Sequence, residues 1–276
     1  MLDKRITVQF MAIALAVKEV LKESIQARKS MPEMADAHCH IESFPMETVR
    51  SSIERGVSII IANGVDTASN IKTLAMSDGK NIFAALGVHP EYAGMPDDEL
   101  EKNIALARSN RKSIIAIGEI GIDKKYAGTD AALERQKYVF SRFVELAVEL
   151  GLPVCVHSRN ALDEIFMILE EKGAKRVQLH FFEGDEKMAI EAESRGYAIS
   201  VPPMESSRRM RAIKAVSMAS LLAETDSPVN GSVPRDVEKS IRIIAAAKGV
   251  PFEDAAVTLV QNTRRFFNIG VASLMR

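Results

Sequence analysis

The five histidines of this chain stand where short apolar runs of the sequence end. They are His38, His40, His89, His157 and His180. Glu119 and Asp226 occupy similar positions, each at or just past the end of an apolar run. Imidazole and carboxylate groups together suit Zn²⁺, Mn²⁺ or another borderline divalent ion, whereas Ca²⁺ prefers oxygen ligands. This set of residue types therefore predicts metal chemistry.

Each of these residues taken alone is weak evidence, because a single histidine or carboxylate after a strand is more often a structural polar residue. Their coincidence at one end of successive strands makes that interpretation improbable for all of them at once. A single catalytic zinc uses about three protein ligands and a water molecule. We therefore expect two ions, held by His38, His40, Glu119, His157, His180 and Asp226.

Two further carboxylates are spaced by two residues from predicted ligands. Asp36 precedes His38 and Glu224 precedes Asp226 by that spacing, which places both members of each pair on the same side of a strand. A ligand histidine commonly donates its second ring N–H to such a carboxylate. We therefore predict that Asp36 and Glu224 orient metal ligands.

Short apolar runs must alternate with helices to bring these residues together. The predicted strands are 34–38, 57–62, 82–88, 113–119, 153–157, 176–180, 197–201 and 221–225. About eight parallel strands joined by helical crossovers predict an α/β fold, a (β/α)8 TIM barrel, whose active site lies at the carboxyl ends of the strands. An open doubly wound sheet is the alternative, but no glycine-rich turn follows the first strand.

Helical periodicity between the predicted strands supports the same fold. The segment 131–150 places apolar residues along one face, and Gly151 stands just past its end as a stop signal. Gly173 and Gly249 end other helical patterns in the same way. No linker or low-complexity tract interrupts residues 34–276, which we interpret as one barrel domain.

Residues 1–33 precede this barrel as a separate extension. Lys4 and Arg5 stand before an apolar run over 6–17, a pattern that resembles a signal peptide. The run is too short to span a bilayer, and its apolar periodicity continues beyond residue 17. We expect an amphipathic helix packed on the domain; a secretory signal, or a true start at Met31 or Met34, are the alternatives.

Composition sets limits on location and partners. The formal net charge of -1 provides no global basic field, so avid coating of duplex DNA is not expected. The two cysteines, Cys39 and Cys155, are interpreted as reduced packing residues, which favours a cytoplasmic protein with no membrane attachment. The oligomeric state is left open.

Six short motifs together resemble the TatD family of metal-dependent nucleases, within the amidohydrolase-like barrels. They lie in the family's order at 36–40, 87–90, 118–123, 157–159, 180–184 and 224–228, within a resemblance that extends to about residue 267. Two features differ from the family pattern, namely the extension before Asp36 and the 201–204 segment Val-Pro-Pro-Met in place of a small-residue turn.

The resemblance implies specific roles for the site residues. His38, His40 and Asp226 would hold one ion, His157 and His180 the other, and Glu119 would bridge them. His89 and Arg159 would contact the substrate phosphate. The ions, Zn, Mn or Mg, would lower the pKa of a shared water, with Asp226 and Glu119 as the catalytic carboxylates and Asp226 receiving the proton. We interpret Asp123 as a residue that orients a ligand or fixes its loop.

The implied function is a deoxyribonuclease that cleaves phosphodiester bonds of short or single-stranded DNA. An aromatic content of 5% without tryptophan leaves little surface for base stacking, so the metal site is better defined than the substrate. A metal-dependent hydrolase of carboxylic esters or amides, such as an aminoacyl-tRNA ester or a lactone, is the first alternative. A non-catalytic metal-binding interaction protein is the second.

Overall fold

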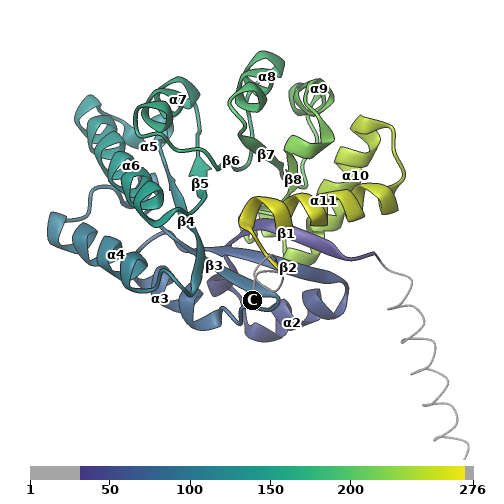
Figure 1. Cartoon of the computed structure of the whole chain (residues 1–276), viewed down its shortest axis with the longest axis horizontal. Coiled ribbons are helices and arrows are strands. Elements are labelled where there is room, and N and C mark those ends of the chain that lie inside the picture. The colour runs from purple at the N-terminus through teal and green to yellow at the C-terminus, as the bar shows by residue number, and fades with distance from the viewer. Residues whose placement is uncertain (1–31, 271–276) are drawn as a thin grey trace, which may run out of the picture. The chain divides into compact units, whose positions relative to one another are not determined.

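The computed structural model describes residues 32–270 of the chain. Its eight strands are all parallel and pair in chain order (Figure 1). They are β1 (Met34–Cys39), β2 (Val57–Asn63), β3 (Ile82–Leu86), β4 (Ile114–Gly121), β5 (Val154–His157), β6 (Val177–Leu179), β7 (Ala198–Val201) and β8 (Leu221–Ala223). Eight such strands alternating with helices form a nearly closed barrel, which confirms the predicted (β/α)8 TIM-barrel fold.

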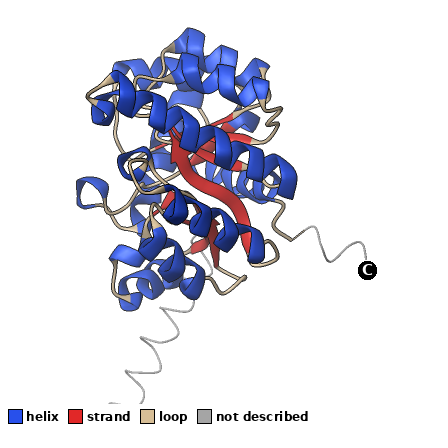
Figure 2. Cartoon of the chain, turned by 90° about the vertical axis from the view of Figure 1, so that its left-hand side faces the viewer, coloured by secondary structure: helices blue, strands red, loops and turns tan. Residues whose placement is uncertain are grey.

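Helices cover the outside of these strands, as Figure 2 shows. They are α2 (Met46–Glu54), α3 (Thr67–Met76), α4 (Asp97–Ser109), α5 (Lys124–Ala127), α6 (Asp130–Leu150), α7 (Leu162–Glu171), α8 (Glu186–Ser194), α9 (Ser207–Ala215), α10 (Val237–Lys248) and α11 (Phe252–Phe267). Short 3-10 helices occupy Ile41–Ser43, Pro90–Tyr92, Met218–Ser220, Val229–Gly231 and Pro234–Asp236. None of the helices in the described ranges is long and apolar enough to cross a membrane.

The predicted N-terminal helical extension lies, apart from Pro32 and Glu33, outside the described residues. Its three interpretations therefore stay predictions.

The longest helix, α6, shows how local sequence sets an element. Thr129 accepts the Ala132 N–H at 3.2 Å and so begins the helix, and Gly151 ends it in a left-handed conformation with φ of 63°. Phe140 and Phe143 point from α6 into the apolar layer between helices and strands and are completely buried. Burying each such side chain contributes about 2–3 kcal/mol to stability.

The barrel closes between β8 and β1 through contacts just beyond the strand ends. The Asp226 N–H donates to the His38 carbonyl at 2.9 Å, and the His40 N–H donates to the Ser227 carbonyl at 2.8 Å. Below them, the Asp36 carboxylate accepts the Thr225 N–H at 2.9 Å and the Thr225 hydroxyl at 2.6 Å. This closure places two predicted ligands, His38 and Asp226, next to each other.

Strand ends differ from the predicted ones near the site. β4 continues to Gly121, so Glu119 lies inside a strand, not at its end. β8 ends at Ala223, before the predicted residue 225, because the Thr225 N–H bonds to a side chain and not to a neighbouring strand. An apolar run shows which residues are buried, but it does not show where backbone pairing stops.

The hydrogen bonds that close the barrel lead to a prediction about stability. Thr225→Val keeps the shape of the side chain but removes the hydroxyl that donates to buried Asp36, so we expect a loss of about 1–3 kcal/mol in the free energy of unfolding. Denaturant unfolding in metal-free buffer measures it. Thr263→Val is the matched control, because its buried hydroxyl donates only to the Leu259 carbonyl of its own helix. Equal losses in the two variants would argue against a closing role for Asp36.

Candidate metal centre

Glu119 is a buried carboxylate whose two oxygens face different groups of histidines. Its Oε2 lies 3.4 Å from His38 Nε2 and 3.3 Å from His40 Nε2. Its Oε1 lies 3.0 Å from His157 Nδ1 and 2.7 Å from His180 Nε2. Only 2% of Glu119 is exposed. One carboxylate thus divides the site into two halves.

Asp226 completes the half around Glu119 Oε2. Its Oδ1 lies 3.6 Å from His38 Nε2 and 3.3 Å from His40 Nε2. Two ligand atoms bound to one tetrahedral zinc, each about 2.1 Å from it, are about 3.4 Å apart. The spacing of these nitrogen and oxygen atoms is therefore the spacing that one ion requires.

The other half is built from β5 and the loop after β6. His157 Nδ1 and His180 Nε2 are 3.3 Å apart, and both lie close to Glu119 Oε1. His38 and His180 stack with ring centroids 3.9 Å apart and so connect the two halves. This half also has the short distances between ligand atoms that an ion needs.

The hydrogen bonding of the rings tests whether the residues fit a metal. Both ring nitrogens of His38 are buried without a hydrogen-bond partner among the described residues, and so is His180 Nδ1. Buried polar atoms are rarely left without a partner, and unpaired imidazole nitrogens are explained when a metal completes them. Groups of three possible ligands occur at His38–His40–Glu119, at His38–His180–Asp226 and at His89–Glu119–His157. The residues therefore fit divalent metal ions.

The electrostatics of the cluster also favour cation binding. Burial lowers the pKa of His38 to about 4, so this ring is neutral and able to ligate. Burial opposes the charged form of Glu119 as well, but the surrounding histidines, first among them His180, outweigh it and hold the pKa of Glu119 well below its usual range. For His180, burial is outweighed by Glu119, which raises its pKa to about 9. A divalent cation would replace the protons that neutralise these carboxylates.

Asp36 and Glu224 are placed differently from the prediction that they orient ligand rings. Both oxygens of Asp36 bond to Thr225, as described above. Glu224 approaches His180 Nδ1 only to 3.9 Å, which is too long for a hydrogen bond. It accepts instead the N–H of Phe181 and, at 2.6 Å, the hydroxyl of Ser200. Glu224 thus holds His180 through the backbone of the next residue, an arrangement that sequence spacing does not show.

Asp123 holds His157 and Arg159 at the same time. Its Oδ2 lies 2.8 Å from His157 Nε2 and accepts Arg159 Nε at 2.9 Å, while Oδ1 accepts the N–H groups that begin α5. Because Nε2 is bonded to Asp123, Nδ1 of His157 is the nitrogen left to face Glu119. The Arg159 guanidinium also lies over the Tyr126 ring, 4.9 Å from its centroid.

His89 also lies beside the second half of the site, but the ring nitrogen that faces the site carries a proton. Its Nε2 lies 3.3 Å from His157 Nδ1 and 3.6 Å from Glu119 Oε1. Its Nδ1 accepts the Glu91 N–H at 3.2 Å, so the neutral ring carries its proton on Nε2. Burial lowers the pKa of His89 to about 4, which keeps the ring neutral. His89 therefore presents a hydrogen-bond donor to the site.

Sequence reasoning missed the group that orients His40. Its Nδ1 lies 2.9 Å from the carbonyl oxygen of Asn63, at the end of β2. A backbone carbonyl carries no sequence signature. The only available signal was a polar residue ending the apolar run 57–62.

A pocket of about 420 Å³ opens above the cluster at the carboxyl ends of the strands. Three aromatic side chains, Tyr92, Tyr126 and Phe181, contribute to its lining. The carboxylates of Glu42, Glu91 and Glu183 line it as well, opposite the cation of Arg159. The rim thus combines stacking surface with charges of both signs.

Two residues at the pocket have left-handed backbone conformations, which are rare for side chains other than glycine. Phe181 has φ of 45° and Asp226 has φ of 52°, and each follows the end of a strand. Such conformations cost about 1–3 kcal/mol each and cluster at functional sites.

Comparisons with known proteins agree with this geometry. The family described as TatD related DNase matches residues 35–268. Deoxyribonuclease TATDN3 of Homo sapiens is 30% identical over 258 residues, covering 85% of this chain and 94% of the human protein. An uncharacterized metal-dependent hydrolase of Methanocaldococcus jannaschii is 32% identical over 244 residues, covering 84% of this chain and 96% of its own length.

A solved structure shows the same fold. The crystal structure of YJJV, a TatD homologue of Escherichia coli K12, superposes with a TM-score of 0.78 at 28% identity. The match covers 86% of this chain and 98% of that one.

The geometry around His157 makes a prediction about metal affinity. Asp123→Ala removes the carboxylate that fixes the ring of His157, so we expect divalent-metal affinity to fall about 10- to 100-fold. Competition with a chromophoric chelator measures this affinity. Asp98→Ala, at an exposed carboxylate on α4, should leave it unchanged. Unchanged affinity in Asp123→Ala would mean that Asp123 fixes only its loop.

Proposed function

The chain belongs to the TatD family of metal-dependent hydrolases, and from this premise we propose that it is a deoxyribonuclease cleaving phosphodiester bonds in short or single-stranded DNA. The observation that carries the proposal is the division of the site by Glu119 into two sets of ligand atoms at the floor of one pocket. Two-metal sites of this kind occur in nucleases and phosphatases. The similarity to a relative named deoxyribonuclease supports the choice of substrate.

The proposed metal ligands follow the two halves of the site. His38, His40 and Asp226 hold one ion, His157 and His180 hold the other, and Glu119 contributes one oxygen to each. Divalent ions, Zn, Mn or Mg, would lower the pKa of a water molecule there and stabilise negative charge on the phosphodiester.

Three residues of the chain then perform the remaining steps. The Asp226 carboxylate accepts the proton of the attacking water, because opposing histidines outweigh burial and keep the pKa of Asp226 low, so that it is ionised. His89 donates a hydrogen bond from Nε2 to a phosphate oxygen. Arg159 supplies a fixed positive charge, held in place by Asp123 and Tyr126.

The size of the pocket favours a strand or an end over an intact duplex. Its volume of about 420 Å³ is at the small end for ligand pockets. Tyr92 and Tyr126 are 40% and 50% exposed and lie on its rim, where bases can stack. The low aromatic content of the chain is thus partly offset by the position of these two rings.

Hydrolysis of a carboxylic ester or amide is the second proposal, and the acidic rim favours it. Glu42, Glu91 and Glu183 would repel a polyanion at the pocket that Arg159 serves. An ester or amide substrate carries less negative charge and needs no phosphate clamp. The third alternative, a binding protein without catalysis, is disfavoured by six converging ligand residues.

The two cysteines bear on location. Both Cys39 and Cys155 are buried free thiols. We propose on this ground, as the sequence suggested, that the protein works in the reducing cytoplasm.

Metal-stripped protein tests the nuclease proposal. We expect it to cleave a short single-stranded DNA only after Mg²⁺, Mn²⁺ or Zn²⁺ is added back. Glu119→Ala should abolish cleavage and weaken the binding of both ions, because one carboxylate serves both halves. Glu186→Ala, on the outer helix α8, is the control and should retain activity. If the native protein binds metal but does not cleave DNA, hydrolysis of an ester or amide becomes the preferred proposal.

Arg159 separates the two enzyme proposals. Arg159→Ala should lower kcat/KM for bis(p-nitrophenyl) phosphate about a hundredfold, since a positive charge on the phosphoryl group is lost. The loss for p-nitrophenyl acetate should be far smaller. Both rates come from the same absorbance assay of p-nitrophenol release. Equal losses for the two substrates would count against a phosphate clamp at this position.

A further inference from the structure

A second cavity of about 400 Å³ adjoins the pocket over the metal centre. Ser158 and Glu183 line both cavities, so the two are neighbours on the same face of the barrel. The second cavity lies at the start of α7 and of α9 and is also lined by Asn160, Ser206, Arg208 and Arg209. None of these four residues has a role in the metal centre.

Arg209 is the unusual member of this lining. It is only 8% exposed, and its Nη1 donates to the Met204 carbonyl at 2.5 Å. Its Nε is buried without a hydrogen-bond partner among residues 32–270, and the charges of Glu183 and Glu224 act on the guanidinium without an ion pair to either. Burial lowers the pKa of Arg209 for the same reason. A buried guanidinium without an ion-pair partner lowers the stability of the fold, and a bound anion would offset this loss.

The free part of the guanidinium has the form that binds phosphate. With Nη1 held by Met204 and the carbon of the guanidinium 5.4 Å from the centroid of the Phe181 ring, the plane is fixed. Nη2 is then the donor left for an anion in the cavity, because Nε lies beneath the surface and supplies only charge.

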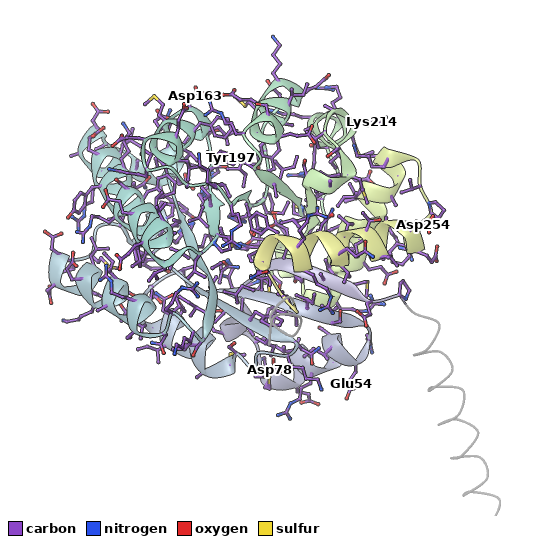
Figure 3. All side chains as sticks on the ribbon, in the orientation of Figure 1. Glu54, Asp78, Asp163, Tyr197, Lys214 and Asp254 are labelled. Carbon is purple, nitrogen blue, oxygen red and sulfur yellow. The ribbon has the colours of Figure 1, made fainter. Side chains whose placement is uncertain are left out.

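The surroundings add positive potential to the same cavity. The ten-residue helix α7 begins after Ala161 with no side chain capping its N–H groups. The helix dipole favours an anion at that end, where Asp163 and Glu164 of the first turn already supply negative charge. Exposed Arg208 adds a mobile cation at the rim. The two carboxylates of the lining, Asp163 and Glu183, are exposed and screened by solvent, and Figure 3 shows Asp163 on α7 at the outer margin.

We propose that this second pocket binds the phosphate next to the scissile phosphodiester of a nucleic-acid strand. The inference rests on the proposed nuclease function. The pocket over the metal centre has room for about one nucleotide. The next phosphate of a bound strand would therefore lie in a neighbouring cavity. The second pocket is such a cavity, and Arg209 lines it.

The binding of inorganic phosphate to the metal-free full-length chain tests the pocket itself, since no metal ion then binds phosphate. Charged His180 and Arg159 remain in the neighbouring pocket, so the dependence on Arg209 assigns the binding to the second one. We expect titration calorimetry to show phosphate binding that Arg209→Gln weakens about 10- to 100-fold. Arg209→Lys, which keeps the charge but loses the planar guanidinium, should lie between the two. Arg111→Gln is the matched control, because Arg111 Nε donates to a backbone carbonyl, that of Leu150, in the turn before β4 at the opposite end of the barrel.

A second measurement tests the assignment to a strand. The metal-loaded enzyme should cleave a dinucleotide carrying an added terminal phosphate with a kcat/KM about tenfold above that for the same dinucleotide without it. One of the two ends, 5′ or 3′, should show this preference. The ratio should fall to about one in Arg209→Gln and persist in Arg111→Gln. Thermal unfolding of each variant checks that the fold is retained.

The outcomes separate this inference from the proposed function. Phosphate binding that is absent, or equal in wild type and Arg209→Gln, overturns the second pocket. Binding that depends on Arg209 without any preference for the added phosphate overturns the strand assignment and leaves a site for a free anion. If neither dinucleotide is cleaved, the nuclease proposal fails, while the phosphate titration still decides whether the pocket binds anions.

Discussion

A single carboxylate, Glu119, is the constraint on which the site depends. It is buried in β4 and surrounded by imidazoles from other strands, so it cannot remain charged without partners that supply positive charge. Each of its oxygens faces a different pair of histidines at 2.7–3.4 Å. Cations at this position would satisfy the carboxylate and the unpaired ring nitrogens of His38 together. Bound metal ions would thus stabilise what is otherwise an unfavourable buried cluster.

The closure of the barrel is part of the same construction. The backbone bond from Asp226 to His38, one of two that join the ends of the sheet, also sets the distance between these two predicted ligands. Asp36 fixes the joint from below through Thr225. Fold stability and ligand geometry therefore depend on the same few hydrogen bonds, and a change at the closure affects both.

The rim of the pocket carries charged side chains of both signs. Arg159 is held rigidly by Asp123 and Tyr126, while three glutamates line the same opening. A site of this kind does not attract polyanions by its overall field, in keeping with a net charge of -1 for the chain. Under the proposed nuclease function, selection of a nucleic-acid strand would depend on local contacts, namely stacking on exposed rings and fixed arginines.

The sequence by itself determined the fold class and predicted the candidate metal ligands that the structure brings together. Apolar runs with a histidine or carboxylate at their ends place those groups on one face of a parallel barrel, because the carboxyl ends of all eight strands lie on the same side. It did not determine the roles of Asp36 and Glu224, since spacing along a strand gives the side of a residue but not its hydrogen-bond partner. Only the tertiary structure decided that Asp36 closes the barrel and that the Asn63 carbonyl orients His40. The buried and unpartnered Nε of Arg209 could likewise not be predicted from the sequence, because its burial arises from the packing of distant segments.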